Sequence, residues 1–110
     1  MTIPLYGRIV SEILDSLKNY SNYKTVDKFG QSGARQISSC YPWELSNFKS
    51  IKICGVNTSL CVLDTVEDLS ACEKRPSKIE VLESACADTY VQSHKWAITQ
   101  MKHLKDVMVV

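Results

Sequence analysis

The spacing of hydrophobic positions changes several times along the chain, and each change predicts an element. Between residues 7 and 19 apolar residues recur three and four positions apart, which predicts an amphipathic helix. The run "SIKICGV", which begins at residue 50, is rich in β-branched residues and typical of a buried parallel strand. From Ser59 the period becomes 3.6, so we expect a helix directly after this strand.

The helix after residue 59 should have one apolar and one charged face. Thr58 or Ser59 is the expected N-cap, because short hydroxyl side chains accept hydrogen bonds from the first turn. We expect Asp64, Glu67 and Asp68 to face solvent. The expected apolar stripe consists of Leu60, Val62, Leu63, Val66 and Leu69.

Strands and helices alternate along the rest of the sequence. A brief helix is expected at "ARQISS", and a longer one should be capped by Asp88 or Thr89 and run to about Leu104. This alternation predicts right-handed βαβ crossovers and a parallel sheet, hence an α/β fold in a single domain, residues 1–110. The four strands are expected at 23–27, 50–56, 78–83 and 106–110.

Composition narrows the classes of function. Thirteen basic residues are interspersed with 12 acidic ones, which gives no electrostatic reason to expect a nucleic acid or membrane partner.

No apolar run approaches the roughly 18 residues of a spanning helix, and acidic residues near the N-terminus argue against a signal peptide, so we expect a cytoplasmic protein. The five cysteines form neither a CxxC pair nor a Cys/His ligand pattern, so we expect reduced thiols, no metal and no cofactor.

Candidate chemistry gathers where the predicted strands end, because ligands of parallel sheets bind at the carboxyl ends of the strands. Lys28 follows the first predicted strand and Cys61 follows the second. A helix start and a nearby lysine both stabilise a thiolate, so Cys61 is a candidate nucleophile. The alternatives are that Cys61 is a small core residue and that Lys28 is a solvated loop residue. Asp27 is a poor candidate base, because adjacent strand residues point to opposite faces.

Three separated segments resemble the isochorismatase-like cysteine hydrolases, the superfamily that includes the nicotinamidases. "ICGVNTSLCV" resembles the turn that carries the nucleophile, and "KFGQSG" is similar to the lysine loop. "ESACADTYVQSHKWAITQM" resembles the acidic strand end with its following helix. Their order and intervals agree across residues 23–110. The resemblance implies a Rossmann-like, three-layer αβα fold with a mainly parallel sheet.

The resemblance also implies roles for individual residues. Cys61 would attack the carbonyl carbon of a small amide-like substrate and cleave its C–N bond through a thioester, with Lys28 steadying the thiolate. The family has a cis peptide in the nucleophile turn, which corresponds to Val56–Asn57. The N–H groups of Asn57 and Cys61 would form the oxyanion hole.

The family's catalytic aspartate, which lies at the end of its first strand, has no counterpart in this sequence. We therefore expect the N-terminal strands of the family fold to be missing from this chain, and the base to come from an upstream segment or a partner chain if the site is active. A strand left without its neighbour exposes an open edge, so we expect a homo-oligomer or a partner chain. The alternative function is that of a catalytically impaired relative retained as a binding or assembly subunit.

Overall fold

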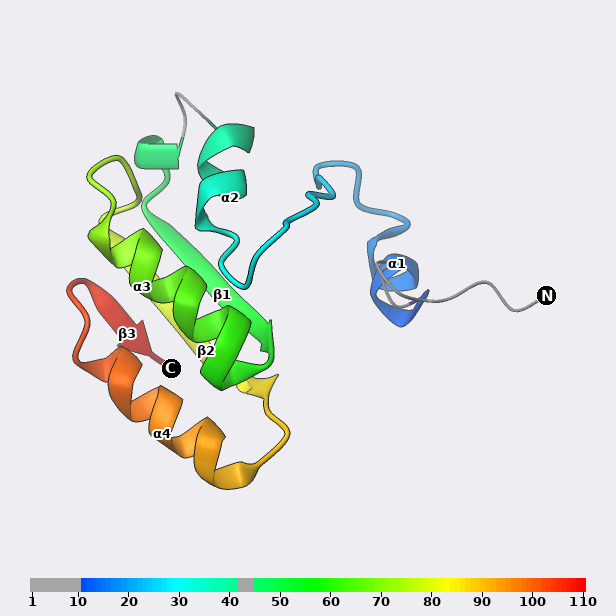
Figure 1. Ribbon diagram of the computed structural model, residues 1–110. Coiled ribbons are helices and arrows are strands. Elements are labelled where there is room, and N and C mark those ends of the chain that lie inside the picture. Colours follow the sequence, from blue (N-terminus) through cyan, green and yellow to red (C-terminus); the bar gives the residue numbers. More distant parts are fainter. Residues whose placement is uncertain (1–10, 42–44) are drawn as a thin grey trace.

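The computed structural model describes residues 11–41 and 45–110, and the elements are labelled in Figure 1. The start of the first expected helix, residues 7–10, lies outside these ranges. The helices are α1 (Ser11–Leu17), α2 (Ala34–Cys40), the short turns η1 (Leu45–Asn47) and η2 (Thr58–Val62), α3 (Leu63–Ala71) and α4 (Val91–Lys102); the strands are β1 (Ser50–Val56), β2 (Lys78–Ala87) and β3 (Val107–Val109).

The three strands form one parallel sheet in the order β1-β2-β3. Ile51 of β1 pairs with Ile79 of β2, and Val81 of β2 pairs with Val109 of β3. The strand β2 therefore lies between the other two. Each crossover passes through a helix on the way to the next parallel strand. The α/β fold with a parallel sheet is therefore confirmed, as are the strands expected from residues 50, 78 and 106.

The prediction of a first strand at residues 23–27 is wrong. Residues 23–27 belong to no helix or strand and form no ladder, and the whole stretch from residue 18 to residue 31 is exposed. A strand is stable only when its backbone groups have ladder partners. Residues 23–27 do not pair with β1, which among the described elements pairs with β2 alone. The other edge of β1 is consequently open within this part of the chain.

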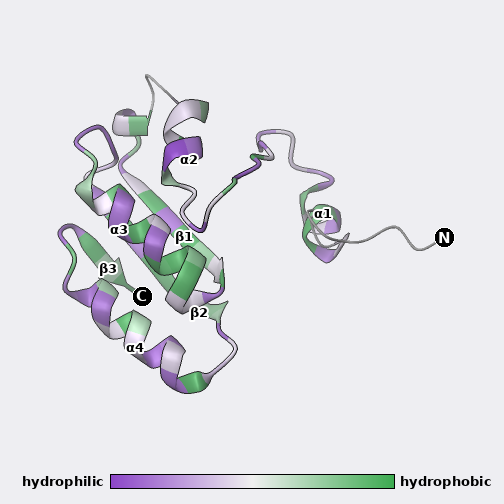
Figure 2. Cartoon of the chain, viewed as in Figure 1, coloured by the Kyte–Doolittle hydropathy of each residue, from purple (hydrophilic) through white to green (hydrophobic). Residues whose placement is uncertain are grey.

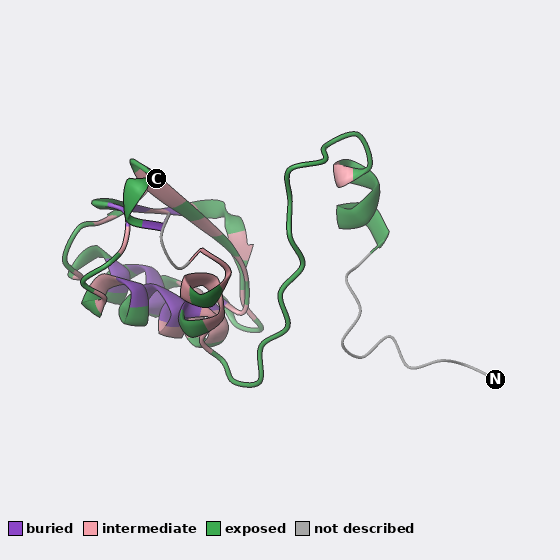
Figure 3. Ribbon diagram, turned by 90° about the horizontal axis from the view of Figure 1, so that it is seen from above, coloured by how far each residue is buried: buried purple, intermediate pink, exposed green. Residues whose placement is uncertain are grey.

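The helices α2, α3 and α4 lie on one face of the sheet, as Figures 1 and 3 show from two directions. The core lies between these helices and the strands, and Figure 2 shows the corresponding mixture of hydrophobic and hydrophilic sides on α3. Burying these aliphatic side chains supplies most of the driving force for folding. The core residues with no exposed surface are Val66, Leu69, Ile79, Val81, Ala97 and Met101.

The opposite face of the sheet is open in the described part of the chain. Ile51 and Ile53 of β1 point toward the core, whereas Lys52, Cys54 and Val56 alternate with them and are exposed. β1 is therefore buried on one face, not on both as its sequence suggested. The described residues thus make up two layers of the implied αβα arrangement.

The helix starts differ from the expected capping pattern. Asn57 precedes η2 and Tyr90 precedes α4, and neither makes a side-chain cap. The hydroxyl of Thr58 and the carboxylate of Asp88 instead join different elements, as described below. The opening turn is a π-helix, which changes the rotation per residue, and Leu60 is 43% exposed instead of belonging to the apolar stripe.

Candidate active site

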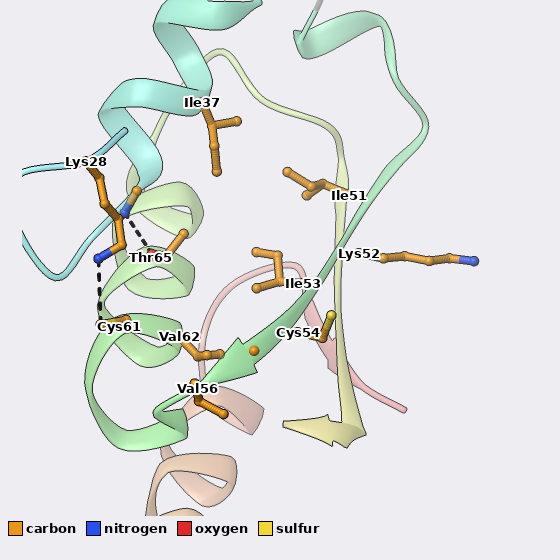
Figure 4. A pocket seen from close by; sticks show the side chains of 12 residues that line it. Lys28, Ile37, Ile51, Lys52, Ile53, Cys54, Val56, Cys61, Val62 and Thr65 are labelled. Atoms are coloured by element: carbon orange, nitrogen blue, oxygen red, sulfur yellow. Dashed lines mark hydrogen bonds between the residues drawn. The ribbon is translucent and has the colours of Figure 1, made fainter. Parts of the chain in front are cut away.

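Lys28 and Cys61 meet beside the carboxyl end of β1. The Nζ atom of Lys28 lies 3.7 Å from the Sγ atom of Cys61 (Figure 4). The same Nζ donates a 2.7 Å hydrogen bond to the carbonyl oxygen of Gly30. Cys61 is partly buried, whereas Lys28 is exposed. Reactive cysteines lie in partly exposed sites beside a cationic side chain, so the arrangement suits a nucleophile.

A hydrogen bond between two elements holds the lysine loop in place. The backbone N–H of Gly33, just before α2, donates to Oγ1 of Thr65 on α3 at 2.8 Å. The next N–H, that of Ala34, donates to Oγ of Ser32 at 3.2 Å. Because Cys61 lies in the turn that leads into α3, the Thr65 contact ties the loop after Lys28 to the helix after Cys61.

The turn that carries Cys61 begins at Gly55 and a cis peptide bond. Gly55 has a φ of +139°, a conformation that favours glycine, and the Val56–Asn57 bond is cis. The carbonyl oxygen of Asn57 accepts hydrogen bonds from the N–H groups of Leu60 and Val62 at 3.1 and 3.2 Å. Val56 itself is 65% exposed on the open side of the sheet.

Two contacts from distant elements hold this turn against β2 and α4. Oγ1 of the fully buried Thr58 lies 2.8 Å from Nδ1 of His94. The Oδ2 atom of Asp88 accepts the Ser59 N–H, and Oδ1 accepts the Thr89 N–H, both at 2.7 Å. These hydrogen bonds lower the pKa of the Asp88 carboxyl below its usual value, and those to Ser59 have the largest effect.

Sequence reasoning did not assign His94 and Asp88 to the support of the nucleophile turn. Both residues belong to "ESACADTYVQSHKWAITQM", the third segment of the family resemblance. The available signal was that this segment resembles the family's acidic strand end and the histidine-containing helix that follows it. Their partners, Thr58 and Ser59, lie 36 and 29 positions away, so only the folded chain brings them together.

A groove runs along the open edge of β1 and ends at the candidate pair. Its volume is about 370 Å³, and its lining is mainly apolar, with Ile37 of α2 facing Ile51 and Ile53 of β1. Lys28 and Cys61 lie at one end of this lining in Figure 4. None of the described residues that line the groove is acidic. The groove can hold a small apolar group beside the thiol, but it offers no carboxylate base.

The described ranges contain neither a cluster of metal-binding side chains nor a candidate membrane-spanning helix. There, no cluster of three or more His, Cys, Asp or Glu residues could hold a metal ion. Residues 11–41 and 45–110 also include no helix long and apolar enough to cross a membrane.

The isochorismatase domain profile matches residues 6–109, which is nearly the whole chain. The chain belongs to the isochorismatase family. This membership confirms the resemblance inferred from the three sequence segments. No curated protein matches the chain.

Solved structures of isochorismatase-like hydrolases and nicotinamidases share this fold. The nicotinamidase/pyrazinamidase PncA from Bacillus subtilis matches with a TM-score of 0.73 and 22% identity, covering 96% of this chain and 55% of its own. The nicotinamidase SaPncA from Staphylococcus aureus matches with a TM-score of 0.68 and 24% identity, covering 89% and 61%. An isochorismatase-like hydrolase from Alkaliphilus metalliredigens matches with a TM-score of 0.65 and 23% identity, covering 81% and 47%.

The chain therefore spans about half the length of these structures, 47–61% of each. At such identities the likeness establishes the fold, and the family profile establishes the family.

Proposed function

We propose that this isochorismatase-family chain carries the nucleophile half of a cysteine hydrolase that cleaves an amide-like C–N bond of a small molecule. The observation that carries the proposal is the 3.7 Å contact between Lys28 Nζ and Cys61 Sγ at the end of an apolar groove. The contact places a cation beside the one thiol that lies at the start of a helix after a parallel strand. The five free cysteines fit a reducing compartment, and the cytoplasm is the location that we propose.

The reaction would proceed in two steps. The Cys61 thiolate attacks the carbonyl carbon, the C–N bond breaks, and the amine takes up a proton as it leaves the thioester. Water then attacks the thioester, which releases the carboxylic acid and restores the thiol. The N–H groups of Asn57 and Cys61 would stabilise the negative oxygen that forms in each step.

The proton of the leaving amine needs a source, and no described residue of the groove lining is a carboxylic acid. In this proposal the acid comes from outside the described residues, from an adjoining segment or a partner chain. The same observation favours one alternative, a catalytically impaired relative that serves as a binding or assembly subunit.

An activated aryl ester separates these two functions, because its phenolate leaves without a proton. The purified chain should be acylated on Cys61 by a small aryl acetate, and mass spectrometry of the digested protein would locate the adduct. Lys28→Met should slow this acylation about tenfold, since it removes the cation beside the thiolate.

Cys54→Ala is the matched control, because Cys54 also lines the groove but lies on β1 and is exposed. This variant should leave the rate of Cys61 acylation unchanged. Acylation of all five cysteines at similar rates, or an unchanged rate in Lys28→Met, would contradict a nucleophilic role and leave the binding-subunit alternative.

A further inference from the structure

Residues 11–27 form an arm that extends away from the sheet and its helices (Figures 1 and 3). Lys24 holds the base of the arm against α2, where its Nζ donates to the Cys40 carbonyl at 3.4 Å and lies 4.5 Å above the Tyr41 ring. The arm exposes five large hydrophobic side chains: Ile13 (55%), Leu14 (40%), Tyr20 (54%), Tyr23 (43%) and Val26 (39%).

This concentration of exposed apolar surface needs a partner. Single exposed hydrophobic residues are ordinary, but several on one short segment mark an interaction surface. Residues 23–27 also belong to no helix or strand and have no ladder partner among the described residues, which leaves this segment open to pairing with a strand edge.

The same molecule carries a surface of matching character. The groove beside β1 has an apolar lining, and the edge of β1 along it has no neighbouring strand in the described ranges. The groove lining holds Lys28 and Lys52 and no described acidic residue, whereas the arm carries three carboxylates, Glu12, Asp15 and Asp27, beside two lysines. An extended segment that pairs with such an edge gains main-chain hydrogen bonds and places alternate side chains in the groove.

We propose that the arm of one copy docks along β1 in the groove of a second copy, and that the two copies exchange arms reciprocally. Both surfaces lie on every copy, so a two-fold arrangement buries two arms and two grooves at once. A standard interface uses about 20–30 residues from each side, and the arm together with the groove lining supplies a number in this range. The exchange does not rest on the proposed function, although the docked arm and the substrate would share the groove that ends at Cys61.

Sedimentation velocity over a range of concentrations tests the assembly. The full chain should form a dimer, and Ile13→Asp with Tyr23→Asp should weaken dimerisation at least tenfold without unfolding the protein, because both positions are exposed. Trp96→Asp is the matched control, since Trp96 is a 54% exposed aromatic residue on α4. A monomer at all concentrations, or equal weakening by the control, would overturn the proposal.

A cross-linking experiment identifies the two surfaces directly. Tyr23→Cys places a thiol on the arm, and the native Cys54 lies in the groove. Chains with this substitution are mixed in ¹⁵N-labelled and unlabelled form, oxidised mildly and digested. Disulfide-linked peptides that combine one labelled and one unlabelled partner are expected. Links confined to peptides of the same label would show that the arm folds onto its own groove, and an absence of links between these positions would equally overturn the exchange.

Discussion

At the scale of single residues, the arrangement around Cys61 depends on partners that are distant in sequence. Lys28 reaches the thiol from 33 positions away, and Asp88 reaches the Ser59 N–H from 29 positions away. Asp88 uses both carboxylate oxygens, because Oδ1 and Oδ2 each accept a different backbone N–H. An amide at this position would offer only one acceptor and would turn an NH₂ group toward the other donor.

Asp88→Asn should therefore lower the free energy of unfolding, and the loss should depend on pH. The pKa of Asp88 is lower in the folded protein than its ordinary value of 3.8, mainly because of its hydrogen bonds to Ser59. The stabilisation is complete above the ordinary value and disappears as the pH falls through the folded value. Urea unfolding at pH 7 and at pH 3 measures the difference from wild type, which should be larger at pH 7. Asp68→Asn, on the exposed side of α3, controls for the loss of one negative charge.

At the scale of elements, α3 is organised by its apolar stripe. Val62, Leu63, Val66 and Leu69 are buried at the positions that the 3.6-residue period predicts. The stripe does not extend back to Leu60, because the preceding turn η2 is a π-helix. The stripe therefore begins at Val62, the last residue of η2, and Leu60 lies outside it.

Two identical substitutions test this boundary. Leu69→Ala should lower the free energy of unfolding by about 2–5 kcal/mol, because Leu69 has no exposed surface and its removal leaves a cavity in the core. Leu60→Ala should cost about 1 kcal/mol or less, because this side chain is 43% exposed. Equilibrium denaturation in urea measures both. Equal losses would place Leu60 in the core after all.

At the scale of the whole molecule, the chain spans about half the length of solved structures with the same fold. The helices α2, α3 and α4 cover one face of a three-stranded sheet, and one edge of β1 is open within the described part of the chain. The groove along that edge holds a thiol and an ammonium group, and no described residue of its lining is acidic.

The purified chain should consequently hydrolyse amides far more slowly than a complete nicotinamidase does. Loss of general acid–base catalysis costs typically 10²–10⁴-fold, even where the thiolate and the oxyanion donors are intact. Ammonia release from nicotinamide, measured beside the Bacillus subtilis enzyme, gives the ratio, and Cys61→Ala sets the background. Full turnover that depends on Cys61 would show that the chain itself contains the acid.

The sequence alone determined the elements whose signals are local. The β-branched run at β1, the period of α3 and the apolar end at β3 predicted these elements, because side-chain spacing selects helix or strand wherever one face is buried. Lys28 and Cys61 were expected on one rim of the sheet, and they are in contact, although the strand at residues 23–27 on which the placement of Lys28 rested does not form.

Only the tertiary structure decided which extended segments become strands and which polar groups become partners. Residues 23–27 have a strand-like sequence but no ladder, because pairing is a property of two segments that one segment cannot encode. Thr58 and Asp88 looked like helix caps, yet their oxygen atoms bond to His94 and to the Ser59 N–H across the fold. A short polar side chain satisfies whichever partner lies within about 3 Å, and that distance is set by how the helices pack on the sheet.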